Sequence, residues 1–233
     1  MSDNYIITEK MNNINGLKVN KNVSMKDYTT FRVGGPADIL IIPENKEALS
    51  KALKLISQTK LPFFTLGSGS NIIVSDSGYK GIVIYMEKLN SIKINKNLIK
   101  AQTGISLSDL ANKAKNFELS GMEFASGIPG SLGGALFMNA GAYGGEMKDI
   151  VESVLTLNYQ GNFREIGAKE LNLSYRNSLL QKENLIAVQA TIELKKGEKQ
   201  KITAKMKELN TKRREKQPLD WPSAGSIFKR PEN

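Results

Sequence analysis

The sequence predicts an α+β fold, because strand-like and helix-like segments alternate irregularly along its 233 residues. The 40% hydrophobic content is enough for a packed core, and no internal repeat or low-complexity tract is evident. The glycine-containing break at Lys195-Lys196-Gly197 is the best candidate for a domain boundary. We therefore expect three parts, at residues 1–70, residues 71–196 and residues 197–233.

The first part has the pattern of a small βαβ unit. Gly34 and Gly35 form a turn that leads into the strand ADILIIP, and Pro43 ends this strand. Asn45 can cap the helix that follows. The segment PFFTL is then a second strand. The helix is predicted from an apolar stripe at i, i+3, i+4 and i+7, formed by Leu49, Ala52, Leu53 and Ile56.

The middle part contains strands at GIVIYM and NLIKAQTG. Ser106 and Asp109 resemble a capping box, which predicts the start of a helix that carries Leu107, Leu110, Ala111 and Ala114. Further along the chain, VESVLTLNY, NFREI and NLIAVQATIEL are strand-like. The turn Gln160-Gly161-Asn162 joins the first two of these strands in a predicted hairpin.

Most of the net charge of +10 is concentrated in one segment. Residues 195–216 contain ten Lys or Arg and three Glu, so this segment contributes +7. Ile202, Met206 and Leu209 recur there at helical spacing, which predicts an amphipathic helix with a solvated basic face. Nucleic-acid binding is the alternative, but no recognisable nucleic-acid module accompanies the helix.

Cysteine and histidine are absent, which excludes several kinds of chemistry from this chain. Disulfides, thiolate or imidazole zinc sites and a Ser-His-Asp triad cannot form, so no metal site is expected. Proton transfer must use Ser, Tyr, Lys, Asp or Glu, and redox chemistry requires a bound cofactor. The start MSDNYIITEKMNN lacks an apolar h-region, and no apolar run approaches about 20 residues, so we expect a cytoplasmic protein without a membrane span.

The segment FASGIPGSLGGALFMNAGAYGG, residues 124–145, contains seven glycines and no charged residue. Glycines let a backbone approach a ligand closely and adopt positive φ, so successive N–H groups can form an anion site. A long uncharged example suits a cofactor whose pyrophosphate meets backbone dipoles while its ring lies on apolar surface. A tightly packed turn system in the core is the alternative.

A second glycine-rich turn, Gly67-Ser68-Gly69-Ser70-Asn71, follows the strand PFFTL. It resembles half of a dinucleotide fingerprint, but Ile72 occupies the position of the third glycine in GxGxxG, which disfavours a Rossmann site. Considered together with residues 124–145, this turn predicts one extended ligand held by two loops.

Two further segments combine cations with groups suited to acid chemistry or anion binding. In PSAGSIFKRP, Ser226 lies on a glycine turn near Lys229 and Arg230, and these cations favour the alkoxide-like state of a donating serine. In YRNS, Arg176 offers a guanidinium fork for a carboxylate or phosphate. A polar turn with incidental cations and a structural arginine are the alternatives.

Taken together, these segments resemble the UDP-N-acetylenolpyruvoylglucosamine reductases. The resemblance covers nearly the whole chain. It implies a p-cresol methylhydroxylase-type FAD-binding fold in two subdomains, residues 1–70 and 71–196, and the beginning of a smaller α+β substrate-binding domain at residues 197–233. The matching segments, in order, are TTFRVGGPAD, LGSGSNIIVSDSGYKGIVI, SGIPGSLGGALFMNAGAYGGE, LSYRNS and PSAGSIFKRP.

The resemblance also implies a two-stage reaction of peptidoglycan precursor synthesis, catalysed by an oxidoreductase of the class that acts on CH–OH. NADPH reduces FAD, and the flavin N5 hydride then goes to the enolpyruvyl double bond of the UDP-sugar, which yields UDP-N-acetylmuramate. In this scheme Ser226 protonates the enolate-like carbon, and Arg176 stabilises the charge on the substrate carboxylate. The UDP-sugar is the partner implied, nucleic acid and membranes are not expected, and the oligomeric state is not predicted.

The other site residues follow from the same resemblance, position by position. The residues expected to contact the substrate or its diphosphate are Tyr175, Lys216, Lys229 and Arg230. The residues expected on the FAD-contacting loops are Gly67, Ser68, Gly69, Ser70, Asn71, Ile128, Pro129, Gly130, Ser131, Gly133, Gly134, Asn139, Gly141, Ala142, Tyr143 and Gly144.

One departure from the family pattern is at the C-terminus. Family members continue past the FKRP motif and supply a catalytic glutamate near their end, whereas Glu232 lies only six residues after Ser226 and has no matching context. We therefore expect the 233-residue chain to bind FAD and to turn over poorly or not at all. The competing interpretations are an alcohol or hydroxy-acid oxidase on the same flavin fold, and a basic module that binds nucleic acid through residues 195–216.

Overall fold

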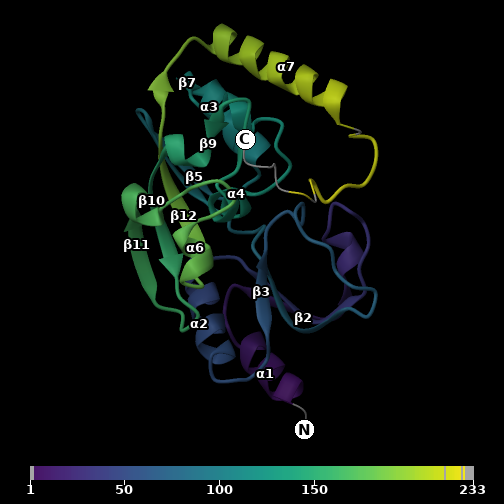
Figure 1. Ribbon diagram of the computed structural model, residues 1–233. Coiled ribbons are helices and arrows are strands. Elements are labelled where there is room, and N and C mark those ends of the chain that lie inside the picture. Colours follow the sequence, from purple (N-terminus) through teal and green to yellow (C-terminus); the bar gives the residue numbers. More distant parts are fainter. Residues whose placement is uncertain (1–2, 218, 227, 229–233) are drawn as a thin grey trace.

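The computed structural model describes residues 3–217, 219–226 and 228 of the chain. Within them the chain forms two main β-sheets, which lie at different ends of the molecule (Figure 1). The first sheet has the order β1-β2-β4-β3, in which β1 is antiparallel to β2 and the other neighbours are parallel. The elements of this region are α1 (Asp3–Asn12), β1 (Leu17–Ser24), β2 (Pro36–Pro43), α2 (Lys46–Ile56), β3 (Phe63–Leu66) and β4 (Tyr79–Tyr85).

The predicted βαβ unit is confirmed as β2, α2 and β3, but these two strands are not direct neighbours. Strand β4 lies between them and pairs with both in parallel. The first sheet therefore extends past residue 70, to Tyr85. Strand β1 and helix α1 were not foreseen from the sequence.

Helix α2 begins and packs as its sequence predicts. The side chain of Asn45 accepts a hydrogen bond from the backbone N of Ala48 at 2.8 Å, which satisfies one of the free N–H groups of the first turn. The apolar stripe that begins at Leu49 is buried against the first sheet.

The second sheet is antiparallel throughout, with the order β11-β10-β12-β6-β5. The hairpin predicted around Gly161 is confirmed, because Gly161 N donates to Asn158 O at 2.9 Å and Gly161 adopts a φ of 76°. Strand β5 was not foreseen. The strands are β5 (Ile92–Asn95), β6 (Leu98–Gln102), β10 (Val151–Leu157), β11 (Phe163–Gly167) and β12 (Ile186–Glu193).

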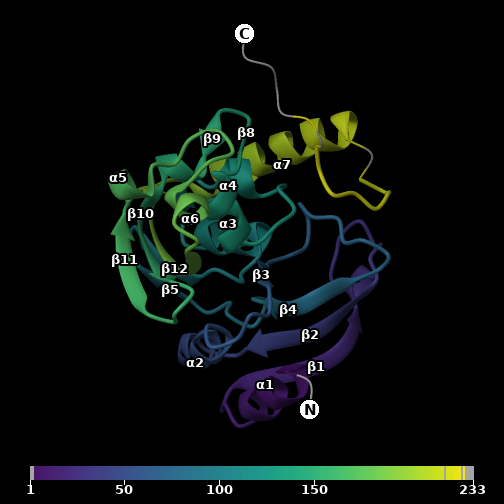
Figure 2. The ribbon, with the colours of Figure 1, turned by 60° about the horizontal axis from the view of Figure 1, so that its bottom comes forward.

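Helices and short strand pairs cover the inner face of the second sheet (Figure 2). Ser106 caps the first of these helices by accepting from Asp109 N at 3.0 Å, as predicted. The helices are α3 (Leu107–Asn116), α4 (Leu132–Met138), α5 (Ala168–Leu171), α6 (Leu179–Lys182) and α7 (Lys199–Lys216). The short pairs are β7 (Leu119–Ser120) with β13 (Lys195–Lys196), and β8 (Gly141–Ala142) with β9 (Gly145–Glu146). The 3-10 helices are Met25–Asp27, Glu123–Ala125 and Met147–Asp149.

The two sheets share part of one hydrophobic core through α2. The apolar side chains of α1, α2 and the inner face of the first sheet pack together with Leu157, Ile186 and Val188 from the second sheet. A second core fills the space between the second sheet and helices α3, α4 and α7. The sheets are therefore held in one arrangement by continuous apolar packing rather than by a flexible linker.

The basic segment forms the helix that its pattern predicts. Ile202, Met206 and Leu209 are buried, whereas most of the Lys and Arg side chains of α7 are exposed. Across the described residues, no helix has both the length and the apolar character that spanning a membrane requires.

The cap of α2 can be tested directly. We expect Asn45→Ala to lower the free energy of unfolding by about 1 kcal/mol, because Ala48 N loses its acceptor. Urea denaturation followed by circular dichroism would measure the change. Asn45→Asp retains an acceptor oxygen and should lose much less; equal losses in the two variants would show that the cap is not the source.

Candidate cofactor-binding site

The two glycine-rich segments lie against each other where the first sheet meets α4. Ser70 Oγ donates to the carbonyl of Pro129 at 2.8 Å. A Cβ atom added at Gly67 would overlap Ser131 Oγ, so any other residue here would require Ser131 to shift. The structure thus brings together the two loops that the sequence predicted to hold one ligand.

A run of backbone N–H groups without acceptors lines the first of these loops. Among the hydrogen bonds of the described residues, none uses a backbone N–H group of residues 67–71 as donor, and the same is true of Gly130 and Ser131. Successive N–H groups in a turn form a concavity that attracts anions. The joined loops therefore suit a diphosphate, which is the anionic part of FAD.

The first turn of α4 is different, because its N–H groups are already used. Ser131 Oγ accepts from Gly134 N at 3.3 Å, and Leu132 N and Gly133 N donate to Ile105 O and Thr103 O at 2.9 and 2.8 Å. Gly133 and Gly134, which the sequence placed among the cofactor contacts, thus make close backbone contacts within the protein. The backbone N–H groups without acceptors are instead those of residues 67–71 and of Gly130 and Ser131.

The loop at residues 67–71 has a fixed conformation. Gly69 adopts a φ of +65°, and a Cβ atom there would overlap the carbonyl oxygen of Tyr28. Thr30 N donates to Gly69 O at 3.1 Å. The segment around Thr30 therefore supports the loop through Gly69, in addition to the contact that Ser70 makes with Pro129.

A network at Asn139 fixes the far end of the glycine-rich segment. Asn139 ends α4 with a φ of 44°, and its side chain donates to Glu146 Oε2 at 2.8 Å and accepts from Lys148 N at 3.0 Å. Hydrogen bonding from Lys148, and from Asn139, lowers the pKa of Glu146 despite some burial. Asn139 therefore orients the β8–β9 hairpin, whose tip is Tyr143 and Gly144, with φ values of 54° and 87°.

Arg176 lies in a tight turn attached to the C-terminal end of α4. Its φ is 55°, and its guanidinium carbon lies 5.7 Å from the centre of the Tyr175 ring. The carbonyl of Phe137 accepts from Ser178 Oγ at 2.8 Å and from Gln181 Nε2 at 2.5 Å. Tyr175 and Arg176 are thus positioned by the same helix whose N-terminal end adjoins the free N–H groups.

The segment that carries Ser226 is attached to the 67–71 loop region. Thr30 Oγ1 donates to Ser223 O at 2.5 Å, and Ser223 N donates to Thr30 O at 3.3 Å. A Cβ atom added at Gly225 would lie 3.6 Å from Ser70 O. Ser226 itself is exposed and, within the described residues, forms no hydrogen bond with Arg176.

The remaining predicted substrate contacts are only partly described. Lys216 is exposed in the last turn of α7. Lys229 and Arg230 lie outside the described residues.

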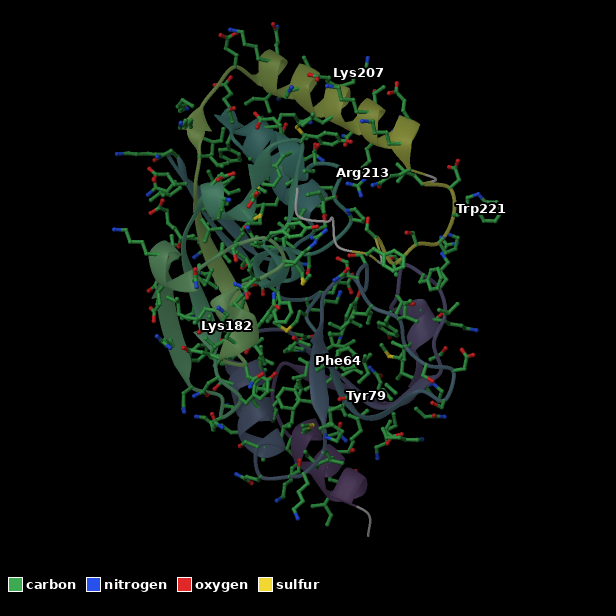
Figure 3. The ribbon with its side chains drawn as sticks, viewed as in Figure 1. Phe64, Tyr79, Lys182, Lys207, Arg213 and Trp221 are labelled. Carbon is green, nitrogen blue, oxygen red and sulfur yellow. The ribbon has the colours of Figure 1, made fainter. Side chains whose placement is uncertain are left out.

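Sequence reasoning missed two contributors to this region. Thr30 was quoted only as part of a motif, although its side chain attaches the Ser223 segment. Arg213 of α7 was counted with the solvated basic residues, but its Cδ would lie 3.2 Å from a Cβ atom at Gly127 (Figure 3). The available signal was spacing, because Arg213 lies four residues after Leu209 and continues the buried stripe of α7.

Comparison with known sequences finds related proteins over nearly the whole chain. A family model described as an FAD binding domain matches residues 37–167. The UDP-N-acetylenolpyruvoylglucosamine reductase of Caldanaerobacter subterraneus subsp. tengcongensis is 47% identical over 229 residues, which cover 97% of this chain and 75% of the relative. The protein of the same name from Clostridium novyi is 44% identical over 215 residues, which cover 92% of this chain and 70% of the relative.

Comparison with solved structures gives the same grouping. The UDP-N-acetylenolpyruvylglucosamine reductase from Thermus caldophilus has a TM-score of 0.79 and 35% identity, over 92% of this chain and 76% of that one. An alkyldihydroxyacetonephosphate synthase has a TM-score of 0.59 at 17% identity, over 82% of this chain and 40% of that one, and shows a shared fold alone. The predicted α+β fold of p-cresol methylhydroxylase type is confirmed.

Gly69 and Gly144 provide a matched test of the loop geometry, since both have positive φ but only Gly69 is closely packed. We expect both alanine variants to cost about 1–2 kcal/mol from backbone strain. Gly69→Ala should cost at least about 2 kcal/mol more, because its Cβ overlaps the Tyr28 carbonyl. Urea denaturation would measure both; a similar loss in the two variants would contradict the tight packing at Gly69.

Proposed function

The chain belongs to the family of UDP-N-acetylenolpyruvoylglucosamine reductases, and on that basis we propose that it serves the FAD-dependent, NADPH-driven reduction of UDP-N-acetylglucosamine enolpyruvate to UDP-N-acetylmuramate. The family is one of flavin oxidoreductases with a role in peptidoglycan synthesis. Reduction of the enolpyruvyl C=C bond gives the lactyl ether of the product, so the reaction acts on a carbon–carbon bond and belongs to the CH–CH class, not to the CH–OH class that the sequence resemblance suggested.

The observation that carries this proposal is the run of free N–H groups at residues 67–71, joined to the glycine-rich segment by Ser70 and Pro129. Backbone donors bind a diphosphate without a charged side chain, provided that the backbone can approach closely. Gly67, Gly69 and Gly130 supply that approach. The loops at residues 67–71 and 128–134, with the hairpin at residues 141–144, are therefore the proposed FAD contacts.

When bound, FAD supplies hydride transfer from NADPH to the substrate double bond. The chain's own residues then have two tasks. Arg176 meets the negative charge that accumulates on the substrate carboxylate, and a fixed cation is most useful where charge grows in the transition state. Ser226 donates the proton to the adjacent carbon, since no histidine is present to do so.

The substrate and its diphosphate are proposed to meet cations from the C-terminal part of the chain. Lys216 ends α7, and Tyr175 shares the turn of Arg176. Lys229 and Arg230 complete the proposed set from sequence resemblance alone. The AGSxFK pattern around Ser226 favours this reductase over an alcohol or hydroxy-acid oxidase on the same fold.

FAD binding is the first test. Titrating the 233-residue apoprotein with FAD should quench flavin fluorescence and give a yellow complex. Gly67→Ala should weaken binding about tenfold or more, because its Cβ displaces Ser131 and opens the joint between the loops. Gly167→Ala is the control, since nothing lies within 4 Å of its Cβ position. A colourless wild-type protein, or equal affinities in both variants, would contradict the proposed site.

The role of Ser226 is tested in a chain completed with the C-terminal part of a full-length relative, by separating the two half-reactions in anaerobic stopped-flow experiments. We expect Ser226→Ala to leave NADPH-dependent flavin reduction within about twofold of wild type. Reoxidation by the enolpyruvyl substrate should slow about 100-fold or more, the usual cost of losing a general acid. Ser226→Thr retains a hydroxyl and should recover part of the rate. Equal loss in both half-reactions would refute proton donation by Ser226.

A further inference from the structure

Arg213 carries an unusual buried atom. Its Nε has no hydrogen-bond partner and no appreciable exposure, and it is the one side-chain nitrogen or oxygen in this state among the described residues. Folded proteins pair nearly all buried polar atoms, so each exception requires a physical explanation. A structural arginine would normally have an acceptor at this position.

The position of Arg213 on α7 is not that of a solvent-facing cation. The buried stripe of the helix runs through Ile202, Met206 and Leu209, and Arg213 continues it one turn further along. Arg213 and Asn210 both press against Gly127, where an added Cβ would overlap Asn210 Oδ1 and lie 3.2 Å from Arg213 Cδ. Figure 3 shows Arg213 on the side of α7 that faces the body of the molecule. The stem of the Arg213 side chain therefore lies against the start of the glycine-rich segment.

No carboxylate balances this charge within the described residues. The neighbouring Lys212 pairs with Glu208 at 2.5 Å, whereas Arg213 takes part in no ion pair. The titratable group that faces it is the phenol of Tyr143 at the hairpin tip. Burial lowers the pKa of the Arg213 guanidinium, which reflects the cost of holding a cation away from water. Such a cost is normally offset by an anion.

We propose that Arg213 is a cofactor-binding residue, whose guanidinium meets the negative charge of FAD at the Gly127 end of the glycine-rich segment. The inference rests on the proposed FAD site, because Gly127 and Tyr143 both belong to that segment. FAD offers two anionic groups, which are its diphosphate and the flavin ring once reduced. Either one would give the guanidinium a charge-assisted hydrogen bond that the protein does not supply.

The experiment compares Arg213→Met with Arg214→Met in the 233-residue chain. The two variants remove the same charge from adjacent positions, but Arg214 is exposed. Methionine keeps the unbranched apolar stem, so the packing against Gly127 is largely retained. Thermal melts of the apoproteins, FAD titrations and the flavin midpoint potential are measured for both variants and for Arg213→Lys.

The proposal expects Arg213→Met to weaken FAD binding about tenfold, or to lower the midpoint potential relative to wild type, while Arg214→Met leaves both unchanged. Weaker binding at an unchanged potential identifies the diphosphate as the partner, and a lower potential identifies the reduced ring. The apoprotein melting temperature should stay the same or rise in Arg213→Met, because a partly buried cation without an ion-pair partner is removed. Arg213→Lys keeps the charge without the planar fork and should give an intermediate effect.

Two results would overturn the proposal. If Arg213→Met and Arg214→Met bind FAD with equal affinity and equal potential, the guanidinium does not meet the cofactor. If Arg213→Met lowers the apoprotein melting temperature and leaves FAD affinity unchanged, its role is structural. A wild-type chain that binds no FAD would instead contradict the proposed function itself, and that result is separate from both of these.

Discussion

The geometry of the candidate site depends on the close contact between Gly67 and Ser131. Gly67 directly follows β3, the edge strand of the first sheet, and Ser131 caps α4, which packs on the second sheet. A side chain at residue 67 would force Ser131 to shift, because its Cβ would overlap Ser131 Oγ. The absence of a Cβ atom at residue 67 thus brings the two glycine-rich loops together, and the backbone N–H groups of residues 67–71 have no acceptor among the described residues. Under the proposed function these donors bind the diphosphate of FAD.

Helix α4 connects the glycine-rich loop at its N-terminal end to the turn that carries Arg176 at its C-terminal end. It is only seven residues long, and its N-terminal N–H groups are satisfied by Ser131, Thr103 and Ile105. At its other end, the Phe137 carbonyl holds the turn that carries Arg176. The donors proposed for the diphosphate and the cation proposed for the substrate carboxylate are therefore positioned by opposite ends of one rigid element. Such a short helix is stable here because the core around it is packed, not because of its own propensity.

The features that the sequence predicted correctly are local ones. The cap and stripe of α2, the Gly161 hairpin and the buried stripe of α7 depend on residues within a few positions of each other. Strand β1 was missed because its mostly polar residues form a strand only by pairing with β2. The insertion of β4 between β2 and β3 was equally invisible, since pairing order is not a local property. In the site, the contact of Thr30 with Ser223 joins residues 193 positions apart, which no motif could indicate.

In the folded structure, part of the positive charge of α7 is neutralised by carboxylates of the same helix. From the sequence, residues 195–216, which carry +7 of the net charge of +10, could either bind nucleic acid or form the solvated face of a helix. In the structure, several of its exposed lysines pair with Glu198 and Glu208 on the same helix, which reduces the field that a polyanion would meet. Arg213, at the buried stripe, has no such pair and faces the glycine-rich segment instead. Under the proposed function, FAD, NADPH and the UDP-sugar all carry a diphosphate, so a modest excess of fixed cations beside the site would attract and hold small anions. The basic composition is therefore compatible with small anionic ligands.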